Sequence, residues 1–100
     1  MPDERRISPR FALQIAVTVT LPEMGLRVQG TTRDISGGGI FLYADVPVHA
    51  SDEVELLLTL PYQISSSEVR VACRAKVLRL EQQNESRRGI AAAIQTFDFL

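Results

Sequence analysis

The sequence contains only one cysteine, one histidine and one lysine among its 100 residues. A single cysteine, Cys73, excludes an internal disulfide, and its place in the alternation of "VRVACRAKV" favours a buried side chain over a nucleophile. His49 lies in a polar segment with no cysteine or serine motif beside it, and the acidic residues show no metal-ligand spacing. We therefore expect no catalytic residues, no metal site and no cofactor.

Long apolar runs and aromatic residues are also scarce. No stretch approaches the roughly 18 apolar residues of a membrane span, and the N-terminus, "MPDERRISPR", is charged where a signal peptide needs an apolar region. Both absences favour a cytoplasmic protein without membrane insertion. Aromatic residues make up only 6% of the chain, and most of them fall where core residues are expected. This argues against a barrel that binds single-stranded nucleic acid by stacking its bases on aromatic side chains.

The composition is that of one globular domain, with 45% hydrophobic and 23% charged residues. We expect residues 1–100 to form this single domain. The net charge of −1 argues against a partner such as DNA or RNA, whose binders normally present a basic surface. All basic residues except Lys76 are arginine, whose planar guanidinium can pair with a phosphate or a base edge. The positions of the arginines therefore matter more than their number.

Alternation of apolar and polar residues predicts short strands and no helix of three turns. The predicted strands cover residues 11–21, 26–35, 39–44, 53–60, 69–81 and 89–97, joined by turns or loops at 22–25, 45–52, 61–68 and 82–88. The second strand is expected to be interrupted or bulged near Gly30. In a domain this small, the sheet would most simply avoid exposed edge strands by closing into a barrel. We therefore predict an all-β fold, a six-stranded antiparallel β-barrel over residues 11–100, preceded by an extended segment.

That segment, residues 1–10, carries Arg5, Arg6 and Arg10 in "RRISPR". Pro9 restricts the residue before it to extended conformations, so the arginines should reach out from an open segment rather than stack on a helix. Such a segment can wrap a ligand, or it can be a solvated basic tail. The segment alone leaves both interpretations open.

A second cluster, "DISGGG" at residues 34–39, contains Asp34, Ser36 and Gly39. It can be a hairpin turn, because Asp and Ser bond their own backbone and glycine tolerates positive φ. It can also bind a ligand, with the carboxylate accepting paired N–H donors and the glycines admitting a flat group. Guanine offers paired donors on one edge and the O6/N7 acceptors, which suit arginine, on the other. We further expect Gly39 to adopt a conformation that a β-branched residue would resist.

The two clusters match two motifs of one family. Residues 6–10 match the RxxxR motif of PilZ domains, and residues 34–39 match their D/NxSxxG motif, in the right order and at about the right separation. The segments "RAKVLRLE" and "RRGIAAAIQTF" look like the last two strands of the PilZ barrel. The sequence therefore resembles a PilZ domain over nearly its whole length.

The resemblance implies a bacterial receptor for cyclic di-GMP that changes conformation on binding and signals to a partner protein or domain. It implies that Arg6 and Arg10, helped by Arg5, take the phosphates and the guanine acceptor edges, while Asp34 and Ser36 hold a guanine and Gly39 keeps the turn open. The alternative is a PilZ-like module that contacts proteins without binding nucleotide. The chain ends at "FDFL" without the C-terminal helix of many members, which leaves the partner open. We expect a monomer or weak dimer, and one bound nucleotide or a stacked pair.

Overall fold

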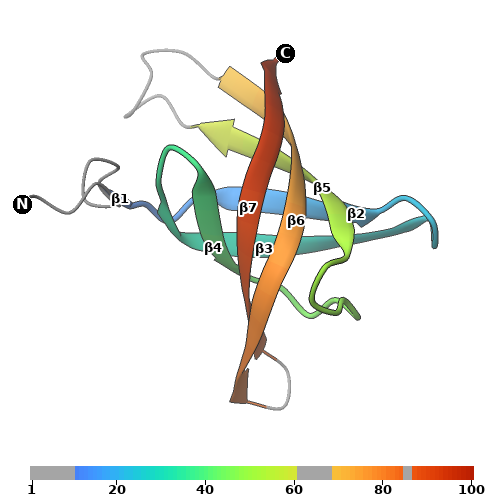
Figure 1. The fold of residues 1–100 in the computed structure, drawn as a ribbon. Helices are drawn as coiled ribbons and strands as arrows, with labels where there is room; N and C mark the ends of the chain where they lie inside the picture. The colour runs from blue at the N-terminus through green and yellow to red at the C-terminus, as the bar shows by residue number, and fades with distance from the viewer. Residues whose placement is uncertain (1–10, 61–68, 85–86) are drawn as a thin grey trace, which may run out of the picture.

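A computed structural model of the chain describes residues 11–60, 69–84 and 87–100. These residues form strands and connecting loops (Figure 1), and none of their segments is a helix that could cross a membrane. The strands are β1 (Phe11–Ala12), β2 (Ala16–Leu21), β3 (Leu26–Ile35), β4 (Gly39–Tyr43), β5 (Glu53–Leu60), β6 (Val69–Asn84) and β7 (Arg87–Phe99).

The strands close into a barrel. Their order is β1-β3-β2-β5-β6-β7-β4, every pairing is antiparallel, and an additional pairing of β3 with β4 joins the ends. Both β1 and β2 pair with β3, and β1 pairs with Asp34 and Ile35 on the edge opposite β4. Because β1 and β2 therefore form one broken strand, the predicted six-stranded antiparallel barrel is confirmed.

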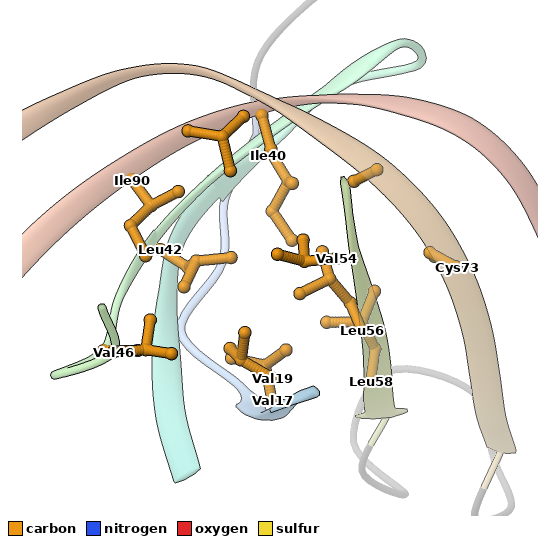
Figure 2. Close-up of a cluster of buried hydrophobic side chains, with 14 of the residues drawn as sticks. Val17, Val19, Ile40, Leu42, Val46, Val54, Leu56, Leu58, Cys73 and Ile90 are labelled. Atoms are coloured by element: carbon orange, nitrogen blue, oxygen red, sulfur yellow. The ribbon is translucent and has the colours of Figure 1, made fainter. Parts of the chain in front are cut away.

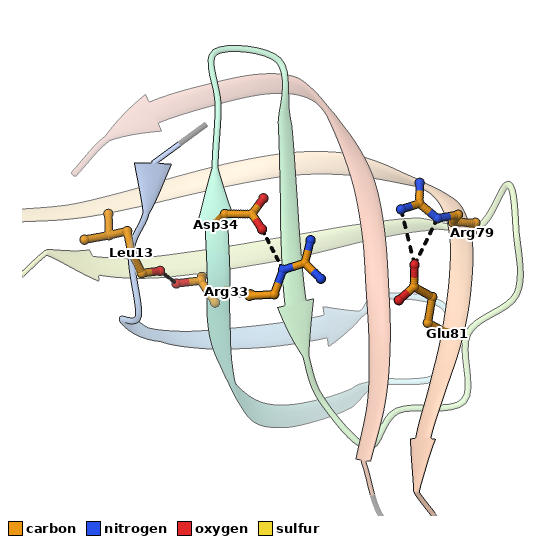
Figure 3. Close-up of polar contacts among 6 residues, drawn as sticks. Leu13, Arg33, Asp34, Arg79 and Glu81 are labelled. Carbon is orange, nitrogen blue, oxygen red and sulfur yellow. Dashed lines mark hydrogen bonds and ion pairs between the residues drawn. The ribbon is translucent and has the colours of Figure 1, made fainter. Parts of the chain in front are cut away.

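The break between β1 and β2 is held by the side chain of Thr32. This residue is 1% exposed and is the one buried polar residue of the described chain. Its hydroxyl donates a hydrogen bond to the carbonyl oxygen of Leu13 (Figure 3) and accepts one from the Ile15 amide at 3.0 Å. The hydroxyl thus pairs two backbone groups that a regular strand would pair with backbone.

We predict that Thr32→Val lowers the free energy of unfolding by about 1 to 3 kcal/mol, since valine keeps the shape but leaves both backbone groups without the hydroxyl. Thr31→Val is the matched control, because Thr31 is exposed on the same strand and should change stability by about 0.5 kcal/mol or less. Urea unfolding measures both. Equal losses in the two variants would show that the hydroxyl is not the cause.

The core follows the alternation of the sequence. The inward residues of the strands pack together in Figure 2, among them Val17, Val19, Ile40, Leu42, Val54, Leu56, Leu58, Cys73 and Ile90. Val46 and Val48, from the predicted loop after β4, join them and are each 1% exposed. Cys73 is buried as expected, and this burial raises the pKa of its thiol. The thiol therefore remains protonated and apolar in character.

Strands β6 and β7 extend further than predicted. Their register continues to the pair of Asn84 with Arg87, through residues predicted as a turn, and at the other end to the pair of Val71 with Phe99. Gln82 and Arg87 near the turn are exposed. Where neither face of a two-stranded ribbon is buried, apolar residues do not recur at every second position. The sequence pattern therefore could not indicate this part of β6 and β7.

The expected bulge near Gly30 is in a different place. Gly30 pairs regularly with Val17, and the irregularity lies between Thr32 and Asp34. Gly30 is required for another reason, because a Cβ there would lie 2.4 Å from the carbonyl oxygen of Tyr43. Glycine inside a strand often marks such a close approach of two backbones.

Candidate functional site

The "DISGGG" segment forms the hairpin between β3 and β4. The Ser36 amide donates to the Gly39 carbonyl oxygen at 2.9 Å, and the Ser36 hydroxyl approaches the same oxygen at 3.4 Å. The Ile94 amide donates to the Gly38 carbonyl oxygen at 3.0 Å, which ties the loop to β7. The hairpin interpretation is therefore confirmed.

A β-bulge just before this hairpin sets the direction of the Asp34 side chain. Thr32 pairs with Leu42 and Asp34 pairs with Phe41, so Arg33 is the extra residue. In a regular strand, Asp34 would point inward like Thr32. The bulge turns it outward beside Arg33, and strand alternation then resumes with Ile35 facing Ile40.

Asp34, Ser36 and Gly39 line one hollow on the outer surface of the barrel, with a volume of about 80 Å³. Phe41 and Ala91 contribute to the same wall. The structure thus brings together the three site residues predicted from the second motif, and the hairpin and ligand-site interpretations are compatible. The other predicted site residues, Arg5, Arg6 and Arg10, lie outside the described residues.

Leu78 and Arg79 of β6 also line the hollow, and neither was predicted from the sequence. A second bulge, between Val77 and Arg79, makes Leu78 an extra residue whose side chain is 57% exposed. Arg79 is oriented by Glu81, whose Oε2 lies 3.3 Å from its Nε and from its Nη2 (Figure 3). The adjacent apolar pair in "KVLRL" breaks the alternation and was the available signal.

The expectation of a special backbone conformation at Gly39 is wrong. The one described glycine with positive φ is Gly25, at 64°. A Cβ at Gly39 would lie 3.5 Å from the Ala92 carbonyl oxygen and 3.6 Å from Ser36 Oγ, which are ordinary contacts. The strand itself therefore tolerates a side chain at Gly39, and that side chain would sit at the rim of the hollow.

Two arginine–aromatic contacts lie next to the hollow on the outer face. The guanidinium carbon of Arg33 is 3.8 Å from the ring centroid of Phe41, and that of Arg87 is 3.8 Å from the ring centroid of Tyr43. The two rings meet edge to face at 5.5 Å. These distances are typical of cation–π and T-shaped aromatic contacts.

The expectation that most aromatic residues lie in the core is wrong. Phe41 is 2% exposed, but its outward ring is covered by Arg33 rather than by the core cluster. Phe97 and Phe99 are 58% and 68% exposed, on the part of β7 beyond its last pair with β4. A phenylalanine gives the same alternating pattern whether its side chain faces the core or the outer surface. The sequence therefore could not distinguish the two orientations.

A larger hollow of about 300 Å³ lies over β5, β6 and β7 and is lined by Glu55, Arg74 and Asp98 among others. No residue of the predicted motifs contributes to it, so we do not assign it to the ligand. In the described parts of the chain, no group of three or more His, Cys, Asp or Glu side chains could hold a metal ion.

The fold and the hollow together define a small antiparallel barrel domain with hydrogen-bonding groups gathered at one hairpin. The sequence profile of the PilZ domain family matches residues 4–98. The chain therefore belongs to the PilZ domain family.

A solved structure supports the fold independently. The Bacillus subtilis inhibitor of motility, MotI/DgrA, superposes with a TM-score of 0.77 at 18% sequence identity. The match covers 98% of this chain and 49% of the MotI/DgrA chain, so the domain spans about half the length of that protein. Comparison with curated protein sequences gives no significant match.

Proposed function

We propose that the protein is a receptor domain for cyclic di-GMP that changes conformation on binding and passes the signal to a partner protein or domain. The observation that carries the proposal is the convergence of Asp34, Ser36 and Gly39 on one hollow of a PilZ barrel. These are the positions that match the D/NxSxxG motif.

The chemistry of these groups fits one edge of a guanine base. The Asp34 carboxylate accepts paired N–H donors, as N1–H and the exocyclic amine of guanine provide, and the Ser36 hydroxyl adds one polar contact. A hollow of about 80 Å³ is smaller than the roughly 300 to 1,000 Å³ of a site that encloses a small molecule. It therefore suits part of a ligand, and the phosphates and the second base must be bound by other groups.

The arginines of the first motif are the groups that we propose for this task. Arg6 and Arg10, with Arg5, would take the phosphates and the guanine acceptor edge from a segment that extends over the hairpin. Guanidinium groups pair with phosphate in two-pronged geometry, which lysine cannot reproduce. No catalytic step is part of the proposal.

Calorimetric titration with cyclic di-GMP tests the proposal, with cyclic di-AMP and GTP as controls. Saturable binding of cyclic di-GMP, with weaker or absent binding of the controls, would support it. Absence of binding by the full chain would refute it and favour a PilZ module that acts through protein contacts alone.

Gly39→Val is expected to weaken nucleotide binding by about tenfold, since a branched side chain at the rim excludes a flat base, with each tenfold costing about 1.4 kcal/mol. Because a Cβ at Gly39 would make only ordinary contacts, we expect the free energy of unfolding of this variant to differ from that of the wild-type protein by about 1 kcal/mol or less. Gly38→Val is a control next to it, since a Cβ at Gly38 meets no atom within 4 Å. Calorimetry and urea unfolding separate the two effects. A large loss of stability in Gly39→Val would restore a structural role for this glycine.

A further inference from the structure

Arg33, the extra residue of the β3 bulge, contacts the carboxylate of Asp34 directly (Figure 3). Its Nε–H donates a hydrogen bond to Asp34 Oδ2 at 2.6 Å, and the Asp34 side chain is 16% exposed. Charge-assisted hydrogen bonds of this kind are about twice as strong as neutral ones. Neither motif that matches the family includes Arg33, so the resemblance assigns no role to it.

Arg33 is itself held by a rigid neighbour. Its guanidinium lies over the Phe41 ring at 3.8 Å. That ring is 2% exposed and is packed against the backbone of Gly89, where a Cβ would come within 2.7 Å of Phe41 Cζ. Tyr43 meets Phe41 on another side, edge to face at 5.5 Å. A series of fixed contacts thus runs from β7 through Phe41 and Arg33 to Asp34.

The electrostatics of Arg33 agree with this arrangement. The hydrogen bond to Asp34 raises the pKa of Arg33, and Tyr43 adds to the shift, whereas burial acts in the opposite direction. The guanidinium is therefore charged at every pH at which a binding experiment would be made. Its side chain is 39% exposed, so it lies at the outer surface and not in the core.

We propose that Arg33 is a positioning residue for the nucleotide, which holds the Asp34 carboxylate in the orientation that accepts the guanine N–H donors. The inference rests on the proposed function. An aspartate without such a partner would have to be ordered when the ligand binds, and this ordering would reduce the affinity. Arg33 removes that cost before the ligand arrives, because the carboxylate is already fixed.

The experiment measures the affinities of full-length variants for cyclic di-GMP and cyclic di-AMP by calorimetry. Arg33→Gln should weaken cyclic di-GMP binding by about tenfold and narrow the preference for guanine over adenine, since immobilising one side chain costs a factor of this order. Arg33→Lys should be intermediate, because lysine keeps a charged donor but loses the planar stack on Phe41.

Arg87→Gln is the matched control. It removes the same charge and an equivalent contact, because Arg87 lies over Tyr43 at the same 3.8 Å. It should leave the affinity within about twofold, a change of roughly 0.4 kcal/mol, and the guanine preference intact. Urea unfolding of each variant shows whether the fold is kept.

A double-mutant cycle decides whether Arg33 acts through Asp34. In the Asp34→Ala background, Arg33→Gln should cause no further loss of affinity. Independent, additive losses would overturn the inference, as would an unchanged affinity of Arg33→Gln or an equal effect of Arg87→Gln. If the wild-type protein does not bind cyclic di-GMP, the proposed function fails and the role of Arg33 toward the nucleotide fails with it. Normal wild-type binding with an indifferent Arg33 refutes only the inference.

Discussion

Arg6→Ala or Arg10→Ala should weaken cyclic di-GMP binding by about 2 to 5 kcal/mol, the range for truncating one partner of a buried charged pair. Each variant should also flatten the dependence of the affinity on salt concentration. The physical reason is that a guanidinium paired with a phosphate contributes a long-range attraction that dissolved ions screen. Calorimetry at two salt concentrations measures both quantities.

Arg27→Ala is the control for these two variants. It removes the same charge from an exposed position of β3 near the turn to β2, where Arg27 pairs with Thr20. Its affinity and salt dependence should stay close to those of the wild-type protein. If Arg6→Ala and Arg10→Ala behaved like Arg27→Ala, the arginine segment would be a solvated tail and the site would consist of the hairpin alone.

Much of the barrel could be predicted because burial on one face leaves a two-residue period in the sequence. Val17 and Val19 of β2, Leu56 of β5 and Ala75 of β6 occupy alternate apolar positions of their strands, and all are buried. The period gives no information where both faces of a ribbon are solvated, as at Gln82. It also cannot separate an outward aromatic, such as Phe97, from an inward one.

The residues of the candidate site were predictable from the sequence only in part. Asp34, Ser36 and Gly39 belong to one short motif, so their proximity followed from the hairpin that the glycines indicate. Leu78 and Arg79 lie 39 or more positions further along the chain than this motif, and a local motif cannot reveal them. Only the pairing of β6 with β7 and of β7 with β4 brings these residues to the hairpin.

Two bulges, in β3 and in β6, explain why the groups that line the hollow face outward. One extra residue in β3 turns Asp34 away from the core, and one in β6 exposes Leu78. Bulges are common at the rims of barrels and next to active sites, where they change the direction of a side chain.

The second large effect is expected for Asp34→Ala, and it should differ in kind from that of the arginine variants. Its loss of affinity for cyclic di-GMP should be about 1.5 to 3 kcal/mol, the contribution of hydrogen bonds to a charged group. Most of the salt dependence should remain, since no phosphate contact is removed. The guanine preference should fall, because a site that pairs with N1–H and the exocyclic amine rejects other bases chiefly through the groups left unpaired.

Asp34→Asn is the matched variant, because it keeps the shape and one carbonyl acceptor but adds two donors and removes the charge. It should fall between wild type and Asp34→Ala in its ratio of affinities for cyclic di-GMP and cyclic di-AMP. The ratio of the two affinities is measured for Asp34→Asn, Asp34→Ala, Arg6→Ala and Arg10→Ala at two salt concentrations. If Asp34→Ala kept the guanine preference and lost as much salt dependence as the arginine variants, Asp34 would be acting through charge alone. The carboxylate would then serve to hold the arginine segment, and the base would have to be recognised by another group at the hollow.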